Sequence, residues 1–208
     1  MAVSGVVLFA FVVGHMVGNL KVFQGSQHFN DYAEGLRVVG APFFARSQLL
    51  WLARAVLLLA VAVHIWAAYE VTRASYAARP VAYRRLAAVE TTYAARTMRW
   101  GGVLIVLYVI YHLLDLTFGP ANPAFAPGDA YGNLVASLQR PTVAVFYLVA
   151  NVVVGLHLYH GLWSAGQTLG LHRTPTDRLR HGFAGAVAGA ITLGYLVIPV
   201  AVLAGWVR

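Results

Sequence analysis

Five long apolar stretches alternate with polar connections along the chain. The apolar stretches cover about 3–20, 48–69, 100–118, 142–165 and 183–206, and each is long enough for an α-helix to cross the hydrocarbon core of a bilayer. The connections between them, 21–47, 70–99, 119–141 and 166–182, contain most of the charged residues. The pattern predicts an all-α membrane protein with five transmembrane helices, in a single domain covering residues 1–208.

The composition agrees with this pattern. Of the 208 residues, 60% are hydrophobic and 11% are charged, and the mean hydropathy is +0.68. Five spans and their connections leave no room for a separate soluble domain, so any soluble chemistry must belong to other chains. The chain has no cysteine, which excludes disulfides, iron–sulfur clusters held by this chain, thiolate metal sites and c-type haem.

The positive charge is concentrated in two of the four connections. The formal net charge is +8, and the second and fourth connections contain nine arginines, namely Arg73, Arg79, Arg84, Arg85, Arg96, Arg99, Arg173, Arg178 and Arg180. The first and third connections contain only Lys21, Arg37, Arg46 and Arg140. The positive-inside rule then places the second and fourth connections and the N-terminus in the cytoplasm. This topology accounts for the basic charge, so we expect no nucleic-acid partner.

Each of the first four apolar stretches contains a candidate functional histidine: His15, His64, His112 and His157. Ionisable residues inside membrane spans are rare and costly. At 1.5 Å per residue, His15 and His112 lie roughly 20 Å from the inner ends of their spans. Spans two and four run the other way, which puts His64 and His157 roughly 9 Å from the inner surface. The histidines are therefore predicted to form an outer pair and an inner pair.

Two imidazoles facing each other across a helix bundle are the ligand set of a bis-histidine haem, so two pairs predict two b-type haems. The alternative is that the histidines only form hydrogen bonds between helices. Zinc is the weaker metal hypothesis, because no Cys, Asp or Glu completes a four-ligand set at either depth. Glycines beside the histidines fit either a flat macrocycle or ordinary close helix packing; they are Gly14, Gly18, Gly155 and Gly161.

Several motifs resemble a known family. They are FVVGHMVGNL around His15, FNDYAEGLR after it, the histidine of the second span, YHLLD around His112 and HLYHGLWSAGQTLG from His157. Together they resemble the five-helix, di-haem cytochrome b subunit of succinate dehydrogenase and fumarate reductase, the cytochrome b558 family of succinate:quinone oxidoreductases. The similarity covers essentially the whole chain, and the order of the four histidines agrees with it.

The resemblance implies ligands and partners. His15 and His112 would ligate the iron of a distal haem, and His64 and His157 that of a proximal haem. The chain would anchor a flavoprotein subunit with FAD and an iron–sulfur subunit on the cytoplasmic face of the inner membrane. Succinate is oxidised on those partners, so this chain would hold no catalytic residue for succinate and would reduce quinone, typically menaquinone. Relatives assemble as trimers or dimers of the whole complex.

Further residues are candidates for contacts to the haem propionates. Arg99 resembles an arginine of the family at the start of the third span, and simple interfacial anchoring is its alternative role. Arg54 lies inside the second span, where we expect it to pair with the distal haem or with Asp115. His160 is a propionate or packing neighbour of the ligand His157. Ser164 would bond the proximal haem or a quinone carbonyl, with helix-end capping as its alternative.

Quinone reduction consumes protons, so a titratable group is expected near an aqueous edge. His28, Asp31 and Glu34 in the first connection are candidates for an outer quinone site, and Gln167 is a candidate near the proximal haem. Aromatic residues near span ends predict an interfacial belt; they are Trp51, Tyr69, Trp100, Trp163 and Trp206.

Two other functions fit the same pattern. One is a free-standing di-haem reductase of the cytochrome b561 type, which would act without a flavoprotein. The other is a haem-free anchor or transporter-like bundle, in which the histidines are only structural.

Overall fold

The computed structural model of the chain describes residues 1–78, 93–168, 170 and 177–208, and the regular structure in those residues is all helical. Within them, five helices are long and apolar enough to cross a membrane. These are α1 (Ala2–Asn19), α3 (Gln48–Ala77), α4 (Tyr93–Leu116), α6 (Pro141–Thr168) and α7 (Asp177–Leu203). Three shorter elements are η1 (a 3₁₀ helix, Leu20–Gln24), α2 (Ser26–Val38) and α5 (Ala130–Leu138). The all-α class and the five apolar spans are therefore confirmed.

The helix ends differ from the apolar stretches of the sequence. The second span was predicted to end at residue 69, but α3 continues to Ala77, because Glu70 and Arg73 pair along its surface at 3.6 Å and their polarity does not interrupt the helix. The fifth span was predicted over 183–206, but α7 covers Asp177–Leu203 and the chain turns at Gly205, where φ is +73°. Hydropathy marks the part of a helix in lipid, whereas hydrogen bonding continues into the polar interface.

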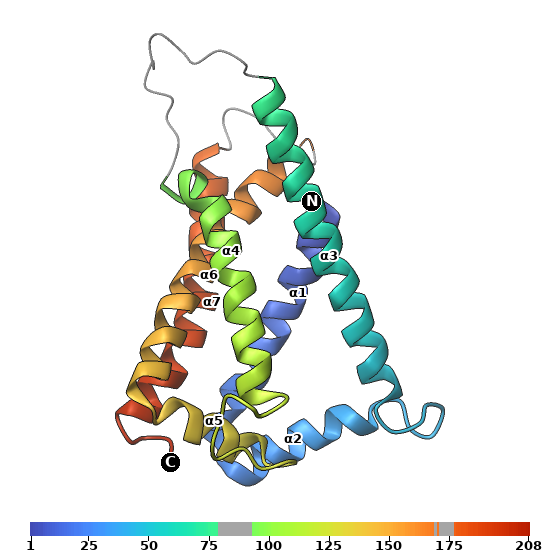
Figure 1. Cartoon of the computed structure of the whole chain (residues 1–208), viewed down its shortest axis with the longest axis vertical. Coiled ribbons are helices and arrows are strands. Elements are labelled where there is room, and N and C mark those ends of the chain that lie inside the picture. The colour runs from blue at the N-terminus through green and yellow to red at the C-terminus, as the bar shows by residue number, and fades with distance from the viewer. Residues whose placement is uncertain (79–92, 169, 171–176) are drawn as a thin grey trace.

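The long helices run between two ends of the molecule (Figure 1). One end holds the starts of α1, α4 and α7 and the finishes of α3 and α6, and we call it the inner end; the opposite end, with α2, α5 and the C-terminus, is the outer end. At the inner end lie Arg73, Arg99, Arg178 and Arg180, so both arginine-rich connections adjoin the same end. Arg79, Arg84, Arg85 and Arg173 lie outside the described residues.

The packing of the long helices is uneven. Helix α6 packs on α7 and α4, and α1 packs on α3 and α7, whereas most contacts of α3 are with α1 and α2. Figure 1 shows α3 leaning away from the other long helices toward the outer end, where α2 runs across to meet it. Side chains of α3 and α4 are therefore brought closest at the inner end.

The outer end holds the main hydrophobic core. Residues from η1, α2, α5, α6 and α7 are buried together there, including Val22, Phe29, Leu138, Tyr147 and Ala201. The segment before α5 is fixed by a buried asparagine, because Asn133 accepts a hydrogen bond from the Ala126 amide at 2.7 Å and donates to the Ala126 carbonyl at 2.9 Å. The outer end therefore holds the buried hydrophobic cluster together with buried polar contacts.

Two helices occur where the sequence predicted only connections. Helix α2 follows a turn at Gly25, whose φ of +94° favours glycine, and its Tyr32 lies where a β-carbon on Gly18 would be. Helix α5 begins at the N-cap Asp129, which accepts a hydrogen bond from the Gly132 amide at 2.9 Å. Connections 21–47 and 119–141 are thus partly helical, and both short helices pack against other elements of the bundle.

Candidate functional site

The outer histidines come from α1 and α4 and lie next to each other. The ring centroids of His15 and His112 are 5.8 Å apart, and the ring planes are inclined by 89°. Phe11 stacks on His15 one helical turn earlier, with centroids 5.2 Å apart. Tyr195 of α7 lies 6.4 Å from the His15 ring and donates a hydrogen bond to the Val12 carbonyl at 2.8 Å. Helix α7, which contributes no histidine to either pair, thereby supports α1 at this level.

The inner histidines come from α3 and α6. The ring centroids of His64 and His157 are 6.2 Å apart, with an interplanar angle of 60°. Tyr147, which lies beside His112, precedes His157 by ten residues on the same helix, and ten residues of α-helix span about 15 Å. The structure thus brings together the two pairs that depth predicts, at two separate levels of the bundle.

The hydrogen bonds of two histidines indicate which ring nitrogen carries the proton. The Ser4 hydroxyl donates to the Met1 carbonyl at 3.0 Å and lies 3.2 Å from Nδ1 of His64. The Tyr147 hydroxyl donates to Asp115 at 2.9 Å and lies 3.5 Å from Nδ1 of His112. Each hydroxyl has given its one proton elsewhere, so toward the histidine it can only accept. With the hydroxyl protons placed in this way, each ring carries its proton on Nδ1, the tautomer that leaves the lone pair of Nε2 for a metal.

The donor sets fit a haem better than a bare metal ion. Two imidazoles bound to one iron at about 2 Å each put the ring centroids roughly 6 Å apart, close to both observed separations. No group of three or more His, Cys, Asp or Glu side chains in the described ranges could hold a metal ion. A site with two protein ligands needs a group that brings its own remaining ligands, as a porphyrin does. A pocket of about 180 Å³, lined by Trp100, Leu104 and Val153 among others, opens beside His157.

A buried carboxylate lies behind the outer pair. The Asp115 side chain is 0% exposed and accepts hydrogen bonds from Arg140 at 2.6 Å, from Tyr147 at 2.9 Å and from the Ser137 hydroxyl. The predicted pairing of Arg54 with Asp115 is wrong. Helix α3 leans away from α4 at this level, whereas Arg140 directly precedes α6, which packs on α4.

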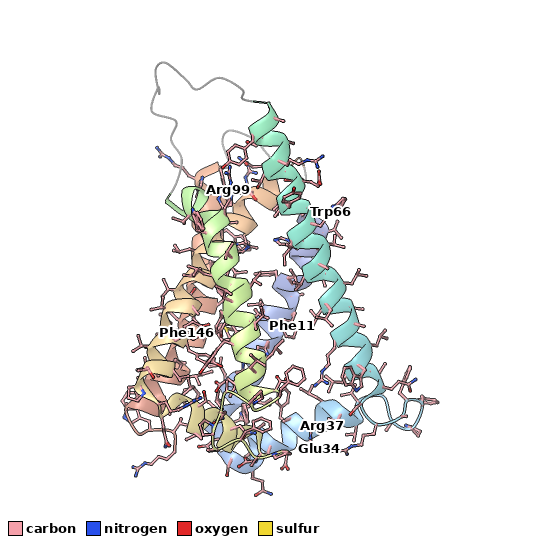
Figure 2. The ribbon with its side chains drawn as sticks, viewed as in Figure 1. Phe11, Glu34, Arg37, Trp66, Arg99 and Phe146 are labelled. Atoms are coloured by element: carbon pink, nitrogen blue, oxygen red, sulfur yellow. The ribbon has the colours of Figure 1, made fainter. Side chains whose placement is uncertain are left out.

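The two arginine candidates for haem propionates lie at opposite ends of the molecule. Arg54 lies about two turns into α3, with its guanidinium 4.7 Å from the centroid of the Trp51 ring. Arg99 lies at the inner end, where its guanidinium is 4.8 Å from the Tyr76 ring centroid and donates to the Tyr76 hydroxyl at 2.5 Å (Figure 2). Both are paired with aromatic side chains, and both remain candidates by their level in the bundle.

An aromatic cluster occupies the inner end between α6 and α7. Trp163 stacks on His181 with centroids 4.8 Å apart, and His160 meets Trp163 edge-on at 5.8 Å. Trp163 is half-buried and packs against α7 through this contact. The other predicted belt residues, Trp51, Tyr69, Trp100 and Trp206, are exposed.

Ser164 and Gln167, the polar candidates near the end of α6, differ in exposure. Ser164 is half-buried and its carbonyl accepts a hydrogen bond from Thr168 at 3.1 Å, while Gln167 is exposed. Both lie in the last two turns of α6, beyond His157 and His160. They are therefore close to the inner surface, as a contact to a proximal group requires.

The outer quinone candidates lie on α2. His28 and Asp31 are exposed, whereas Glu34 forms ion pairs with Arg46 and with Arg37, the latter at 2.9 Å (Figure 2). Hydrogen bonds from Arg46 and then Arg37 hold the pKa of the Glu34 carboxyl below its usual range. A carboxylate held ionised in this way is a poor proton donor, which counts against Glu34 as the proton source of an outer quinone site.

The glycines separate into two groups. A β-carbon on Gly18 would overlap Tyr32, and one on Gly155 would overlap Thr192, so these two glycines serve close packing. Nothing lies within 4 Å of the corresponding position on Gly14 or Gly161. Only the second pair remains available for the approach of a planar group.

The chain matches no protein-family model, no curated protein and no solved structure. The function of this chain must therefore be inferred from its own side chains.

The sequence did not predict the residues that contact Nδ1 of His64 and His112, nor the arginine that pairs with Asp115. Tyr147 and Ser4 lie inside apolar stretches and have no distinctive spacing, and Arg140 stands out only as one of the few cations of its connection. The available signal is Asp115, which follows His112 by three residues and so shares its helix face. His181 of the inner cluster has no signal in the sequence.

Proposed function

We propose that this chain is the membrane-anchor subunit of a succinate:quinone oxidoreductase, which passes electrons from an iron–sulfur subunit through two b haems to quinone. The observation that carries the proposal is the pairing of four histidines from four different helices. His15 meets His112 and His64 meets His157 at ring separations of 5.8 and 6.2 Å, at two levels of the bundle. The family resemblance of the motifs around these histidines adds the partner chains.

Each histidine pair would hold one of the two haems. When bound, the haems would supply one-electron redox chemistry, with potentials set by their ligands, hydrogen bonds and burial. His64 and His157 would hold the inner haem near the arginine-rich end, and His15 and His112 the outer haem. Ser4 and Tyr147 keep the proton of His64 and His112 on Nδ1, so that Nε2 can ligate. Arg99 at the inner end and Arg54 nearer the outer end are candidates for the propionates.

Partners and quinone are assigned to ends of the bundle on the same reasoning. The flavoprotein subunit with FAD and the iron–sulfur subunit would dock on the inner end, at the cytoplasmic face of the inner membrane. Menaquinone, the quinone that the resemblance implies, would be reduced near α2, where His28 and Asp31 reach the aqueous edge. The assembly would be a dimer or trimer of the whole complex.

The test is a reduced-minus-oxidised optical spectrum with haem quantification on the detergent-purified assembly, together with a gel of its subunits. We expect two b haems per copy of this chain, accompanied by a flavoprotein and an iron–sulfur chain. Haem without these partners would favour the free-standing cytochrome b561 type. The absence of a Soret band would favour the haem-free bundle and overturn the proposal.

Single histidine variants then assign the two sites. His64→Leu and His157→Leu should each halve the haem content by removing the inner haem, whereas His15→Leu and His112→Leu should remove the outer one. His181→Gln is the matched control, because His181 lies at the same end as His157 but pairs with Tyr159, at 2.9 Å. Retention of both haems in His64→Leu or His157→Leu would contradict the assignment.

A further inference from the structure

We propose that Tyr147 is a positioning residue for the outer metal ligand, and that it acts as the link between His112 and the buried carboxylate of Asp115. The proposal rests on the proposed function, since His112 must be a ligand for its position to matter. It adds three side chains to the outer site, because Tyr147 accepts from His112, Asp115 accepts from Tyr147, and Arg140 balances the charge of Asp115.

The number of available protons fixes the direction of the hydrogen bonds that join His112, Tyr147 and Asp115. Tyr147 has one hydroxyl proton and donates it to Asp115 at 2.9 Å, so its oxygen can only accept from Nδ1 of His112, 3.5 Å away. That contact is at the long limit of a hydrogen bond. With Tyr147 as the acceptor, His112 carries its proton on Nδ1 and keeps the lone pair of Nε2 free for a metal.

The side chains around Asp115 favour its ionised form. Its side chain is 0% exposed and its two oxygens accept from the Ser137 hydroxyl, the Tyr147 hydroxyl and the Arg140 guanidinium. Three donors around one carboxyl group are the partners of an ionised carboxylate. Arg140 is 31% exposed and also donates to the Ala121 carbonyl at 2.9 Å, which anchors it from the other side.

The inner pair lacks this arrangement. His64 is held by Ser4, a neutral hydroxyl whose proton goes to a backbone carbonyl. Nδ1 of His157 is buried without a hydrogen-bond partner among the described residues. Within the part of the chain that the structure describes, only the outer pair therefore has an anion hydrogen-bonded behind one ligand, and a carboxylate that acts through a hydrogen bond makes an imidazole a stronger donor to a metal.

The experiment is Tyr147→Phe in the detergent-purified full assembly. Loss of the acceptor should weaken haem binding at the outer site about 10- to 100-fold, and it should raise the midpoint potential of the outer haem, because a weaker donor stabilises ferric iron less. The inner haem should keep its potential and its occupancy. Tyr108→Phe is the matched control, since the Tyr108 ring is 5.9 Å from His112 but its hydroxyl points to Asn151.

A second measurement needs no haem. In the haem-free full chain with ¹⁵N-labelled histidine, the ¹⁵N chemical shifts of His112, assigned by comparison with His112→Gln, report which nitrogen carries the proton. We expect the Nδ1–H tautomer in the wild type and a mixture in Tyr147→Phe. A proton on Nε2 in the wild type would overturn the proposal, as would an unchanged outer potential and affinity in Tyr147→Phe.

The two proposals fail in different ways. If the purified wild-type assembly binds no haem, the proposed function is wrong, although the tautomer of His112 still reports on the Tyr147 link. If the wild type binds two haems and Tyr147→Phe behaves as Tyr108→Phe does, the proposed function stands and the role of Tyr147 is wrong.

Discussion

Asp115 and Arg140 show how a charged side chain is accommodated in the apolar bundle. Asp115 lies on the apolar helix α4, and its carboxylate accepts hydrogen bonds from Ser137, Arg140 and Tyr147, all within residues 137–147. Burying an isolated carboxylate costs far more than one hydrogen bond returns, so the arrangement depends on having all its donors in place. The segment that joins α5 to α6 is therefore held to α4 by charge as well as by apolar contact.

Loss of Arg140 should destabilise the fold. Arg140→Met removes the cation and leaves Asp115 buried with two hydroxyl donors only, and breaking one partner of a buried ion pair costs about 3 kcal/mol. Thermal unfolding of the detergent-solubilised protein measures the effect. The double variant Arg140→Met with Asp115→Asn should recover part of the loss, since no unpaired charge then remains. A single variant as stable as the wild type would show that Asp115 carries no charge.

The levels of the histidines could be predicted at the residue scale, but their lateral contacts could not. A rise of 1.5 Å per residue fixes depth once the direction of each span is known, so His15 groups with His112 and His64 with His157 without any knowledge of packing. The sequence contains no comparable rule that predicts which helices are neighbours. Arg54 was therefore paired with Asp115 on depth alone, whereas α3 leans away and Arg140 takes that position.

At the scale of elements, α2 and α5 show what hydropathy overlooks. The apolar residues of α2, Phe29, Tyr32, Ala33 and Leu36, recur at helical spacing, so this helix had a readable signal inside a polar connection. Helix α5 has nine residues and begins at an aspartate N-cap, in a segment whose prolines and glycines suggest a loop. Its order depends on contacts from other elements, which no local pattern reveals.

The contact between α2 and α5 is a polar clasp that should depend on pH. Asp129 accepts from the Gly132 amide and from the Asn30 side chain, each at 2.9 Å, and Asn30 accepts from the Tyr131 amide at 2.9 Å. The Gly132 amide and then Asn30 lower the pKa of the Asp129 carboxyl from its usual value. A depressed pKa stabilises the folded state above the unfolded pKa of about 4, and this stabilisation is lost as the pH falls through the lower folded pKa.

Hydrogen exchange of α5 measures this clasp. Below about pH 4, protonation of Asp129 should raise the exchange of the first amides of α5, after correction for the intrinsic pH dependence of exchange. Asp129→Asn can still accept but cannot ionise, so its corrected exchange should not change over the same range. Equal pH dependence in the wild type and in Asp129→Asn would show that the carboxylate contributes nothing to the clasp.

At the scale of the whole molecule, the two ends differ in charge and in packing. The outer end holds the hydrophobic core and the buried polar contacts of Asp115 and Asn133, while the inner end holds the described arginines of the second and fourth connections and the aromatic cluster around Trp163. The sequence predicts which connections share an end, because helices that cross a membrane must alternate in direction. It places a given end in the cytoplasm only through the positive-inside rule.

That orientation is open to a direct test, because the chain has no cysteine and one introduced cysteine is unique. Ala78 at the inner end and Ala124 at the outer end are both exposed. If the arginine-rich end is cytoplasmic, a membrane-impermeant maleimide added to spheroplasts should label Ala124→Cys and leave Ala78→Cys unlabelled. Inverted vesicles should give the reverse pattern. Equal labelling after solubilisation controls for reactivity, and labelling of Ala78→Cys from outside the cell would put the docking end on the wrong side for a cytoplasmic flavoprotein.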